Sequence, residues 1–335
     1  MRAMTRLAVP LLIASAMLAG CISVNASLGS GREKLRPQPV LAVGEEGSRD
    51  RVALIPLRGV IVDAPDEGLL GSRPGPLASL GRQLAMAEAD DRVRAVVLRV
   101  DSPGGSVAAS EMAYREIRMF RERTGKPVVI SMGEVAASGG YYAALAGDRI
   151  VAEPTTLTGS IGVVVASLNV SEGLERIGVE SRFVTSGPNK DIANPLAPVR
   201  TAHYRILQGL VDEYYGRFRG LVVQRRDALA TGSVDELTDG RVFTGETARR
   251  LGLVDELGGV RTAFLQAVQL AGLESATLVR YAPRGGPPQT IYAEAPLARP
   301  MAVADASVSG IRVDAASLGL PTGMRPGVAY YLYLP

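Results

Sequence analysis

The sequence predicts an α/β domain built from repeated strand–helix–strand units with mostly parallel sheets. Two runs, residues 93–100 and 127–132, have the length and nearly continuous apolar character of strands buried on both faces. Residues 76–89 lie before the first run and residues 108–123 lie between the two, both with apolar residues at helical spacing. Because strands joined by helices run parallel with right-handed crossovers, this alternation indicates the fold class.

Breaker residues mark the ends of the elements. Gly59 interrupts the first strand, Gly125 stops the second helix and Gly178 ends a later one. The predicted strands are residues 52–62, 93–100, 127–132, 149–152, 162–167 and 179–185. The predicted helices are residues 76–89, 108–123, 137–146, 170–177 and 200–229, the last being one long amphipathic helix or two.

The composition excludes several classes of protein. The chain has 335 residues, enough for one large domain or two small ones. One Cys and one His exclude a disulfide within the chain and argue against a zinc site. The formal net charge is +3, Trp is absent, and no basic stripe occurs, which argues against nucleic-acid binding. Neither Gly-rich nucleotide fingerprint is present. We therefore expect no metal, no cofactor and no nucleic-acid partner.

The first residues have the features of a secretory signal peptide. Arg2 and Arg6 precede an apolar segment that is too short to span a bilayer comfortably. It ends in Leu-Ala-Gly-Cys21, which resembles the lipobox of bacterial lipoproteins, where the chain is cut before the Cys and the Cys carries lipid. An ordinary signal peptide with a stray Cys and a poor membrane helix are the alternatives. The lipobox is favoured because the chain's one Cys falls where the motif requires it.

Three segments carry residues suited to chemistry. Residues 101–105 (Asp-Ser-Pro-Gly-Gly) follow a buried strand, and the glycines let backbone N–H groups point outward, although such a string is also a common turn. Ser138 lies in Ala-Ala-Ser-Gly-Gly-Tyr-Tyr at the start of a helix, where taken alone it is a helix cap. Lys190 is the single Lys of the polar loop 186–195, where taken alone it is an exposed surface residue.

Taken together, these segments resemble the signal peptide peptidase A family of bacterial serine peptidases, which is related in fold to the Clp protease and crotonase group. The resemblance runs from about residue 52 to about residue 271. The matching strings, in the family's order and at comparable spacing, are V-D-S-P-G-G, A-S-G-G-Y-Y, T-G-S-I-G-V, S-G-P-N-K-D-I-A-N-P and D-G-R-V-F-T-G-E-T-A-R-R-L-G-L-V-D.

The resemblance implies a role for each matched residue. Ser138 matches the nucleophile, Lys190 the general base and Ser160 the hydroxyl that orients the Lys. Gly105 and Gly139 match the amides of the oxyanion hole. These five residues are the predicted catalytic site.

A Ser/Lys dyad makes independent chemical sense. A serine needs a base to become a nucleophile. A free lysine has a pKa of about 10.4, so burial has to lower it by several units before a lysine can serve, at about 1.4 kcal/mol a unit. A Ser-His-Asp triad would require His203, which lies in a helical segment away from the matched strings, and this argues against a triad.

The family's architecture implies an assembly. Long members contain two tandem copies and bring a Lys from one copy to a Ser of the other, whereas this chain shows no second copy. We therefore expect a homo-oligomeric ring in which Ser138 and Lys190 meet across protomers. Many members carry an uncleaved transmembrane anchor where this chain has a lipobox.

These inferences divide the chain into four parts. Residues 1–20 are the lipoprotein signal peptide and residues 21–51 a lipid-anchored flexible tether rich in Gly, Ser, Pro and charge. Residues 52–275 are the peptidase domain, with a helical extension at its C-terminal end. Residues 276–335 are a tail to which the sequence assigns no role.

The expected function is hydrolysis of short, unfolded, apolar peptides such as cleaved signal peptides. One alternative is a non-catalytic envelope lipoprotein that binds or scaffolds peptides, and another is a crotonase-like enzyme acting on an acyl thioester. Export argues against the thioester enzyme, because acyl-CoA is cytoplasmic. The lipobox implies a lipid-anchored envelope protein facing the periplasm, and the Ile22 that follows Cys21 favours the outer membrane by resemblance to lipoprotein sorting.

Overall fold

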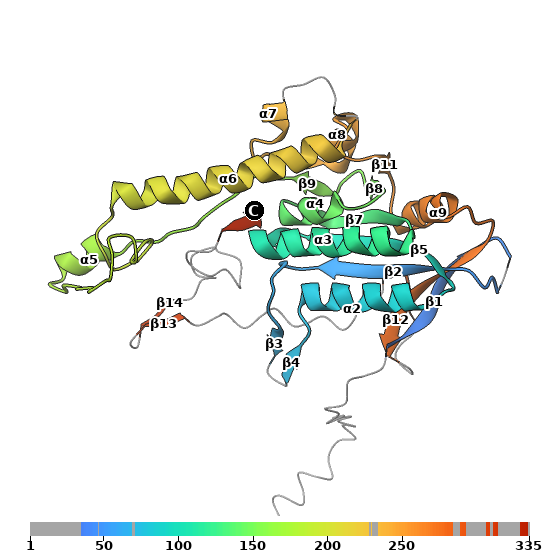
Figure 1. Cartoon of the computed structure of the whole chain (residues 1–335), viewed down its shortest axis with the longest axis horizontal. Helices are drawn as coiled ribbons and strands as arrows, with labels where there is room; N and C mark the ends of the chain where they lie inside the picture. Colours follow the sequence, from blue (N-terminus) through green and yellow to red (C-terminus); the bar gives the residue numbers. More distant parts are fainter. Residues whose placement is uncertain are drawn as a thin grey trace, which may run out of the picture. The chain divides into compact units, whose positions relative to one another are not determined.

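A mostly parallel sheet forms the centre of the molecule, which confirms the predicted α/β class (Figure 1). The computed structural model describes residues 35–45, 47–68, 71–227, 229, 234–283, 289–292, 306–308, 311–313 and 329–333. The predicted signal peptide and Cys21 lie outside the described residues. In the sheet order β1–β12–β2–β5–β7–β8–β11, each of the pairs from β12 onward is parallel. β9 pairs in parallel with β7 and antiparallel with β10.

The nine strands of this sheet are β1 (Leu35–Val43), β2 (Arg51–Arg58), β5 (Val93–Ser102), β7 (Val128–Ala137), β8 (Arg149–Ala152), β9 (Leu157–Gly159), β10 (Val242–Thr244), β11 (Glu256–Leu257) and β12 (Ala276–Pro283). The helices are α2 (Pro76–Ala89), α3 (Val107–Thr124), α4 (Gly139–Ala144), α5 (Ser171–Arg176), α6 (Thr201–Arg225), α7 (Val234–Leu237), α8 (Gly245–Arg250) and α9 (Val260–Leu270). Short strand pairs are β3 (Asp66–Gly68) with β4 (Gly71–Arg73), β13 (Ala306–Val308) with β14 (Ile311–Val313), and β6 (Gly104–Ser106) with β15 (Tyr330–Leu332). Among the described helices, none has the length and apolar character to cross a membrane.

Alternate residues of the central strands fill two hydrophobic layers. Val96 and Leu98 of β5 lie in the layer with α2, α3 and α4, whereas Ala95 and Val97 lie in the layer with α9. Because successive side chains of a strand point to opposite faces, a strand between two helical layers has to be apolar throughout. This explains the unbroken apolar runs in the sequence.

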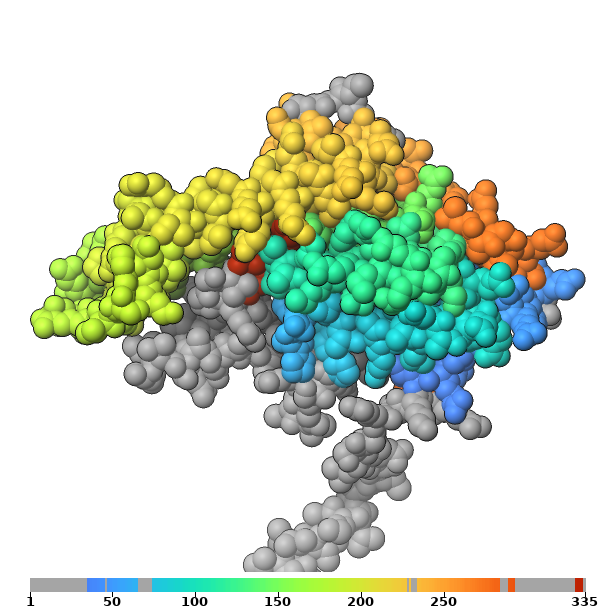
Figure 2. Space-filling model, viewed as in Figure 1, coloured from blue at the N-terminus to red at the C-terminus, as the bar shows by residue number. Residues whose placement is uncertain are grey.

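Helices α3 and α4 are held to α6 by an ionic and aromatic cluster. Arg217 of α6 donates two hydrogen bonds to Glu111 of α3, at 3.1 and 2.7 Å, and the Glu111 carboxylate also bonds the hydroxyl of Tyr142. Phe218 of α6 is fully buried against Tyr142. In Figure 2 the yellow atoms of α6 lie directly on the teal atoms of α3.

Several predicted boundaries need correction. Residues 35–43 of the predicted tether form β1, which pairs antiparallel with β12 from Leu35↔Pro283 to Val43↔Ala276. The predicted tail also enters the fold, because β12 (276–283) lies inside the main sheet and β15 pairs with β6. Charge and proline in residues 35–51 suggested a tether, but a strand at a sheet edge tolerates both.

Two predicted strands are wrong. Residues 179–185 form no strand, and Val179, Phe183 and Val184 are exposed. Val179, Phe183 and Val184 suggested a strand, but no described strand pairs with these residues. Residues 162–167 form only an isolated bridge, between Val164 and Tyr330.

Candidate active site

Ser138 lies at the junction of β7 and α4 with a strained backbone. Its φ is 51° and its ψ is −116°, a conformation that L residues rarely adopt. The backbone is held from both sides, because Ser138 N–H donates to Gly159 O at 2.8 Å and Tyr142 N–H donates to Ser138 O at 2.8 Å. Ser138 occupies the N-cap position of α4, but its side chain makes no capping hydrogen bond. The hydroxyl is therefore available for another task.

The Ser138 hydroxyl is buried without a partner among the described residues. The residue is 1% exposed and its Oγ makes no hydrogen bond. Ser110 of α3 has a second such hydroxyl, and it lies close to Gly139, since a Cβ built on Gly139 would be 2.3 Å from Ser110 Oγ. Buried polar groups are normally paired, so two hydroxyls without a protein partner close to Gly139 single out this region as a candidate site. The sequence prediction missed Ser110, whose only signal is a polar residue on the buried face of a helix.

Ser160 lies beside Ser138 because of the register of two strands. β7 and β9 pair in parallel with Ala137 opposite Gly159, and each serine is the next residue of its chain segment. Ser160 has a φ of 49°, is 9% exposed and donates its N–H to Arg241 O at 2.8 Å. Apart from Ala193, these serines are the only described non-glycine residues with a positive φ. Such strain gathers at functional sites.

Gly105 and Gly139 bring two backbone segments into close approach. A Cβ built on Gly139 would lie 3.0 Å from Gly105 N, and a Cβ built on Gly105 would lie 1.9 Å from Ile61 O. The turn before them is fixed by Ser102, whose Oγ accepts from Gly104 N–H at 3.1 Å and donates to Gly59 O at 2.6 Å. A Cβ at either position would meet atoms at 3.0 Å or less, so neither position accepts a larger residue.

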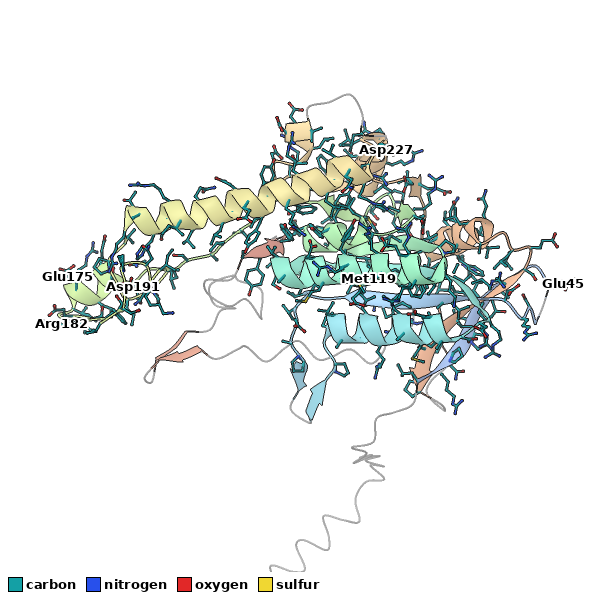
Figure 3. All side chains as sticks on the ribbon, viewed as in Figure 1. Glu45, Met119, Glu175, Arg182, Asp191 and Asp227 are labelled. Carbon is teal, nitrogen blue, oxygen red and sulfur yellow. The ribbon has the colours of Figure 1, made fainter. Side chains whose placement is uncertain are left out.

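One chain does not bring Lys190 to Ser138. Lys190 is exposed, and within the described part of the chain its ammonium group makes no hydrogen bond or ion pair. Figure 3 shows the next residue, Asp191, beside Glu175 and Arg182 at the end of α6 that lies away from α4. The predicted dyad is therefore separated within a single protomer.

The loop that carries Lys190 is held by the N-terminal end of α6. Arg200 forms an ion pair with Asp191 at 2.8 Å and donates to Pro188 O at 2.9 Å. The His203 ring bonds the same carbonyl at 2.8 Å and is 6% exposed. His203, the single His of the chain, thus supports the Lys190 loop.

The C-terminal strand β15 lies against the glycines of the site. It pairs antiparallel with β6, with Tyr331 opposite Gly105. A Cβ on Gly104 would lie 2.0 Å from Tyr331 O, and one on Gly139 would lie 3.0 Å from the same atom. The sequence prediction assigned no role to this segment, although its apolar run Tyr-Tyr-Leu-Tyr-Leu was a signal for a buried strand.

Burial and charge tune the groups around α4. Burial, and then the Glu111 carboxylate, raise the pKa of the Tyr142 phenol. Burial also opposes ionisation of Glu111, but hydrogen bonds from Arg217 and Tyr142 outweigh it, and the pKa of Glu111 falls below its ordinary value. Both groups therefore keep their neutral-pH forms, a phenol and a carboxylate, when the helix contacts form.

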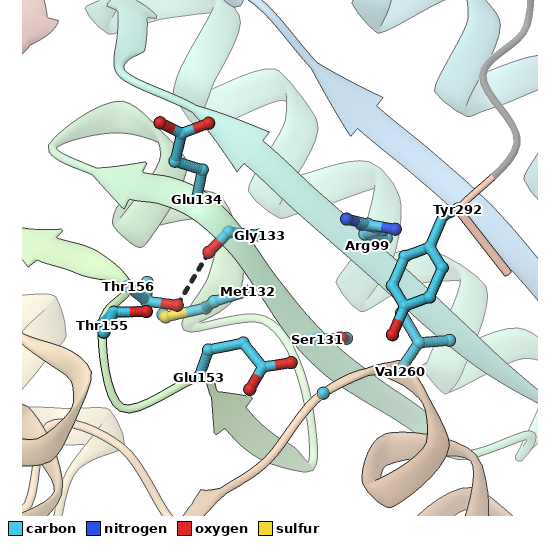
Figure 4. Close-up of a pocket in the computed structure, with 11 residues that line it drawn as sticks. Arg99, Ser131, Met132, Gly133, Glu134, Glu153, Thr155, Thr156, Val260 and Tyr292 are labelled. Atoms are coloured by element: carbon cyan, nitrogen blue, oxygen red, sulfur yellow. Dashed lines mark hydrogen bonds between the residues drawn. The ribbon is translucent and has the colours of Figure 1, made fainter.

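A separate pocket of about 210 Å³ lies on the α9 side of the sheet (Figure 4). It contains neither Ser138 nor Lys190, and Glu153 and Glu134 stand at its edge with Arg99. Burial, followed by the charge of Arg58, lowers the pKa of Arg99. The described residues contain no group of three or more His, Cys, Asp or Glu that could hold a metal ion. The lining residues are Arg99, Ser131, Met132, Gly133, Glu134, Glu153, Thr155, Thr156, Gly259, Val260 and Tyr292.

The sequence profile of Peptidase family S49 matches residues 121–274, and that of Clp protease matches residues 77–157. A protein of Synechocystis sp. named as a protease is 37% identical over 227 residues, which cover 68% of this chain and 76% of that protein. A protein of Enterococcus faecium that bears the name signal peptide peptidase SppA is 33% identical over 238 residues, covering 71% of this chain and 69% of its own. Protease 4 of Salmonella typhi is 39% identical over 225 residues, and the match spans 67% of this chain and 35% of that longer protein.

Proposed function

Because the chain belongs to the signal peptide peptidase A family of serine peptidases, family S49, we propose that it is a membrane-anchored endopeptidase that uses Ser138 and Lys190 as a catalytic dyad. The observation that carries this proposal is the buried, unpartnered hydroxyl of Ser138 on a strained backbone at the start of α4. No described side chain or backbone group competes with a substrate or a base for this hydroxyl.

The reaction follows from the groups around Ser138. A neutral Lys190 takes the hydroxyl proton while Oγ attacks the carbonyl carbon of the peptide. The N–H groups of Gly105 and Gly139 stabilise the oxyanion that forms. The lysine then gives its proton to the leaving amine, and water hydrolyses the acyl-enzyme by the same route. Ser160 directs the lysine, and its place beside Ser138 supports this role.

The lysine comes from a neighbouring protomer in this proposal. The exposure of Lys190 and its distance from α4 in one chain support a shared site. The region around it is also apolar and uncovered in one chain: Tyr204, Ile206 and Leu210 of α6 are each more than 40% exposed. Contact with a second copy would bury this surface and shield the lysine from water. A homo-oligomeric ring satisfies both needs.

The substrate class and location complete the proposal. A site whose nucleophile is 1% exposed admits an extended peptide more readily than a folded protein, and this supports short, unfolded, apolar substrates such as released signal peptides. We propose that lipid on Cys21 tethers the enzyme to the envelope membrane on the periplasmic side, with the outer membrane favoured.

The proposal is tested by turnover of an apolar fluorogenic peptide with the full chain in detergent, beside Ser138→Ala, Lys190→Ala and Ser160→Ala. Loss of the nucleophile or the base should lower kcat by about 10³-fold or more. Loss of Ser160 should lower it by up to about 10²-fold, the cost of a misplaced group. Equal turnover by all four chains would show that another nucleophile or a contaminant acts.

A non-catalytic, peptide-binding lipoprotein is the competing function. This alternative predicts that the variants bind the peptide with the affinity of the parent. It also predicts no turnover in any chain, including a correctly assembled parent. The thioester alternative predicts hydrolysis of an acyl-CoA that the Ser138→Ala variant retains, because that chemistry needs the oxyanion hole and not the serine.

A further inference from the structure

Arg99 and Ser131 lie directly opposite one another in the pocket on the α9 side of the sheet. The two residues are partners in the parallel register of β5 and β7. Each continues a row whose preceding member, Val97 or Val129, belongs to the hydrophobic layer of α9. Because neighbouring strands lie about 4.8 Å apart, the two polar side chains start close together on this face.

Both side chains keep a hydrogen-bond donor that has no partner among the described residues. Ser131 is 1% exposed and its Oγ makes no hydrogen bond, and the buried Nε of Arg99 also makes none. The Arg99 guanidinium donates from Nη1 to Ile291 O at 3.1 Å and lies over the ring of Tyr292, 5.4 Å from its centroid. Two adjacent donors, one of them charged, match the two oxygens of a carboxylate.

Two carboxylates stand on the other side of the pocket. Figure 4 shows Glu134 and Glu153 across from Arg99 and Tyr292. Glu153 lies at the start of α9, since a Cβ built on the N-cap residue Gly259 would clash with its Oε1. The positive end of the helix dipole attracts this carboxylate and holds it beside the pocket. Negative charge at the edge disfavours a bare anion and favours a ligand that brings its own cationic group.

The size and the walls of the pocket fit a small molecule. Its volume is about 210 Å³, room for about seven water molecules at about 30 Å³ each. This space accepts an amino acid or a dipeptide. Met132 and Val260 add apolar wall between the two charged sides. A pocket with apolar walls and a few converging polar groups is typical of small-molecule sites.

We propose that this pocket binds a small zwitterion, an apolar amino acid or a dipeptide. Its carboxylate accepts hydrogen bonds from Arg99 Nε and Ser131 Oγ, and its ammonium group pairs with Glu153. Its apolar side chain lies against Met132 and the ring of Tyr292. The ligand thus supplies the acceptors that Arg99 and Ser131 lack among the described residues. The site contains neither residue of the proposed dyad and does not depend on the peptidase function.

Isothermal titration calorimetry with the full chain in detergent tests the site. The probes are L-leucine and the dipeptide Leu-Leu, and the one that binds more tightly shows the length that fits. At least one should bind with a Kd of about 1 mM or lower. The same probe with an acetylated amine, or with an amide in place of its carboxylate, should bind at least about tenfold more weakly. Binding of neither probe, or equal binding of the free and blocked forms, would overturn the inference.

Variants of the pocket test the two donors. Arg99→Gln and Ser131→Ala should each weaken binding of the tighter probe by about tenfold or more. Arg94→Gln is the matched control, because Arg94 lies on the same strand, does not line the pocket and has a side chain that is 53% exposed. It should bind the probe as the parent does. Parent-like affinity in both pocket variants would refute the assigned contacts.

The stability of Ser131→Ala separates binding from folding. Loss of a hydroxyl that has no protein partner leaves no other group unpaired, so the Tm without ligand should equal or exceed that of the parent. A lower Tm would show that the hydroxyl already serves the fold and would overturn its role as a free donor. This variant therefore keeps the test decisive even if Arg99→Gln fails to fold.

The Ser138→Ala protein distinguishes this site from the proposed function. It should bind the probe with the affinity of the parent, because the pocket does not contain Ser138. Probe binding by a parent that turns over no peptide would remove the peptidase proposal and leave the zwitterion site. Peptide turnover by a parent that binds neither probe would do the reverse.

Discussion

Ser138 and Ser160 are the first residues beyond one strand pair, Ala137 of β7 opposite Gly159 of β9, and both have a positive φ. The two strands thus deliver two hydroxyl-bearing residues to one place at the same level of the sheet. Each backbone is also fixed by a hydrogen bond from its own N–H, to Gly159 O and to Arg241 O. The geometry therefore depends on the sheet and not on a loop.

The strain at Ser138 has a measurable cost. We expect the free energy of unfolding of Ser138→Gly to exceed that of Ser138→Ala by about 1 kcal/mol, because glycine adopts a positive φ without a steric penalty. The glycine variant should therefore unfold at a higher temperature. Neither variant has the nucleophile, so both should be inactive. Thermal denaturation followed by circular dichroism makes the comparison. A glycine variant that is less stable than the alanine variant would show that this backbone is relaxed.

A shared active site predicts that two inactive chains restore activity together. In equal co-expression of Ser138→Ala and Lys190→Ala, about half of the protomers supply an intact Ser and about half of their neighbours an intact Lys. About a quarter of the parent's activity should return, whatever the ring size. Peptide turnover by the purified mixture measures it. A site built within one protomer would give no recovery, provided that differently tagged chains co-purify.

The close packing of Gly44 predicts that the strand before it belongs to the folded domain. Gly44 has a φ of +76°, and a Cβ there would lie 2.6 Å from Ser275 Cβ and 2.7 Å from Glu274 O. We expect Gly44→Ala to cost about 3 kcal/mol of the free energy of unfolding. Gly47→Ala is the matched control, since Gly47 has a φ of +83° in open space, and it should cost about 1 kcal/mol. Equal urea midpoints for the two variants would contradict the docking of β1.

The lowered pKa of Glu111 predicts a stability term that depends on pH. Because the folded state lowers this pKa, the stabilisation is present above about pH 4.3 and disappears as the pH falls through the lower folded value. Glu111→Gln should therefore cost about 1 kcal/mol at pH 7, or about 2–4 °C in Tm, and much less near pH 3.

Glu122→Gln is the control for this measurement. Glu122 pairs with Arg118 on an exposed part of α3, where the side chains are 59% and 46% exposed. Its effect on Tm should stay small at both pH values, because water screens an exposed pair. A difference between parent and Glu111→Gln that is the same at pH 3 and pH 7 would mean that packing, not charge, holds Glu111.

Local signals in the sequence were sufficient where local physics decides the structure. The apolar runs of β5 and β7 and the breaker Gly125 predicted strands and a helix end, because burial on both faces and a left-handed C-cap leave direct marks. Residues 179–185 show the converse. Their apolar residues Val179, Phe183 and Val184 suggested a strand, but a strand also needs a partner, and partner position is a property of the whole fold.

The sequence led to the expectation that Ser138, Ser160, Gly105 and Gly139 lie together, and the structure places them so, while their roles stay predictions. Lys190, 52 residues further along the chain (190 − 138), lies near the end of α6 away from α4, so that one chain does not complete the predicted dyad. This separation is compatible with the expected site between protomers, which also stays a prediction. The apolar run that includes residues 330–333 was a signal for a buried strand, but its partner strand β6 could not be predicted, because partner position is a property of the whole fold.

The position of β1 limits how far the enzyme can work from a membrane. For a chain anchored through Cys21, as we propose, the sheet begins at Leu35, 14 residues later (35 − 21). A fully extended chain covers about 3.3–3.6 Å per residue, so a tether from Cys21 to Leu35 reaches about 50 Å at most. The longer tether predicted from the sequence, which ends at Arg51, would reach about 100 Å. If Cys21 carries the proposed lipid, the first strand of the domain would thus lie within about 50 Å of the lipid surface.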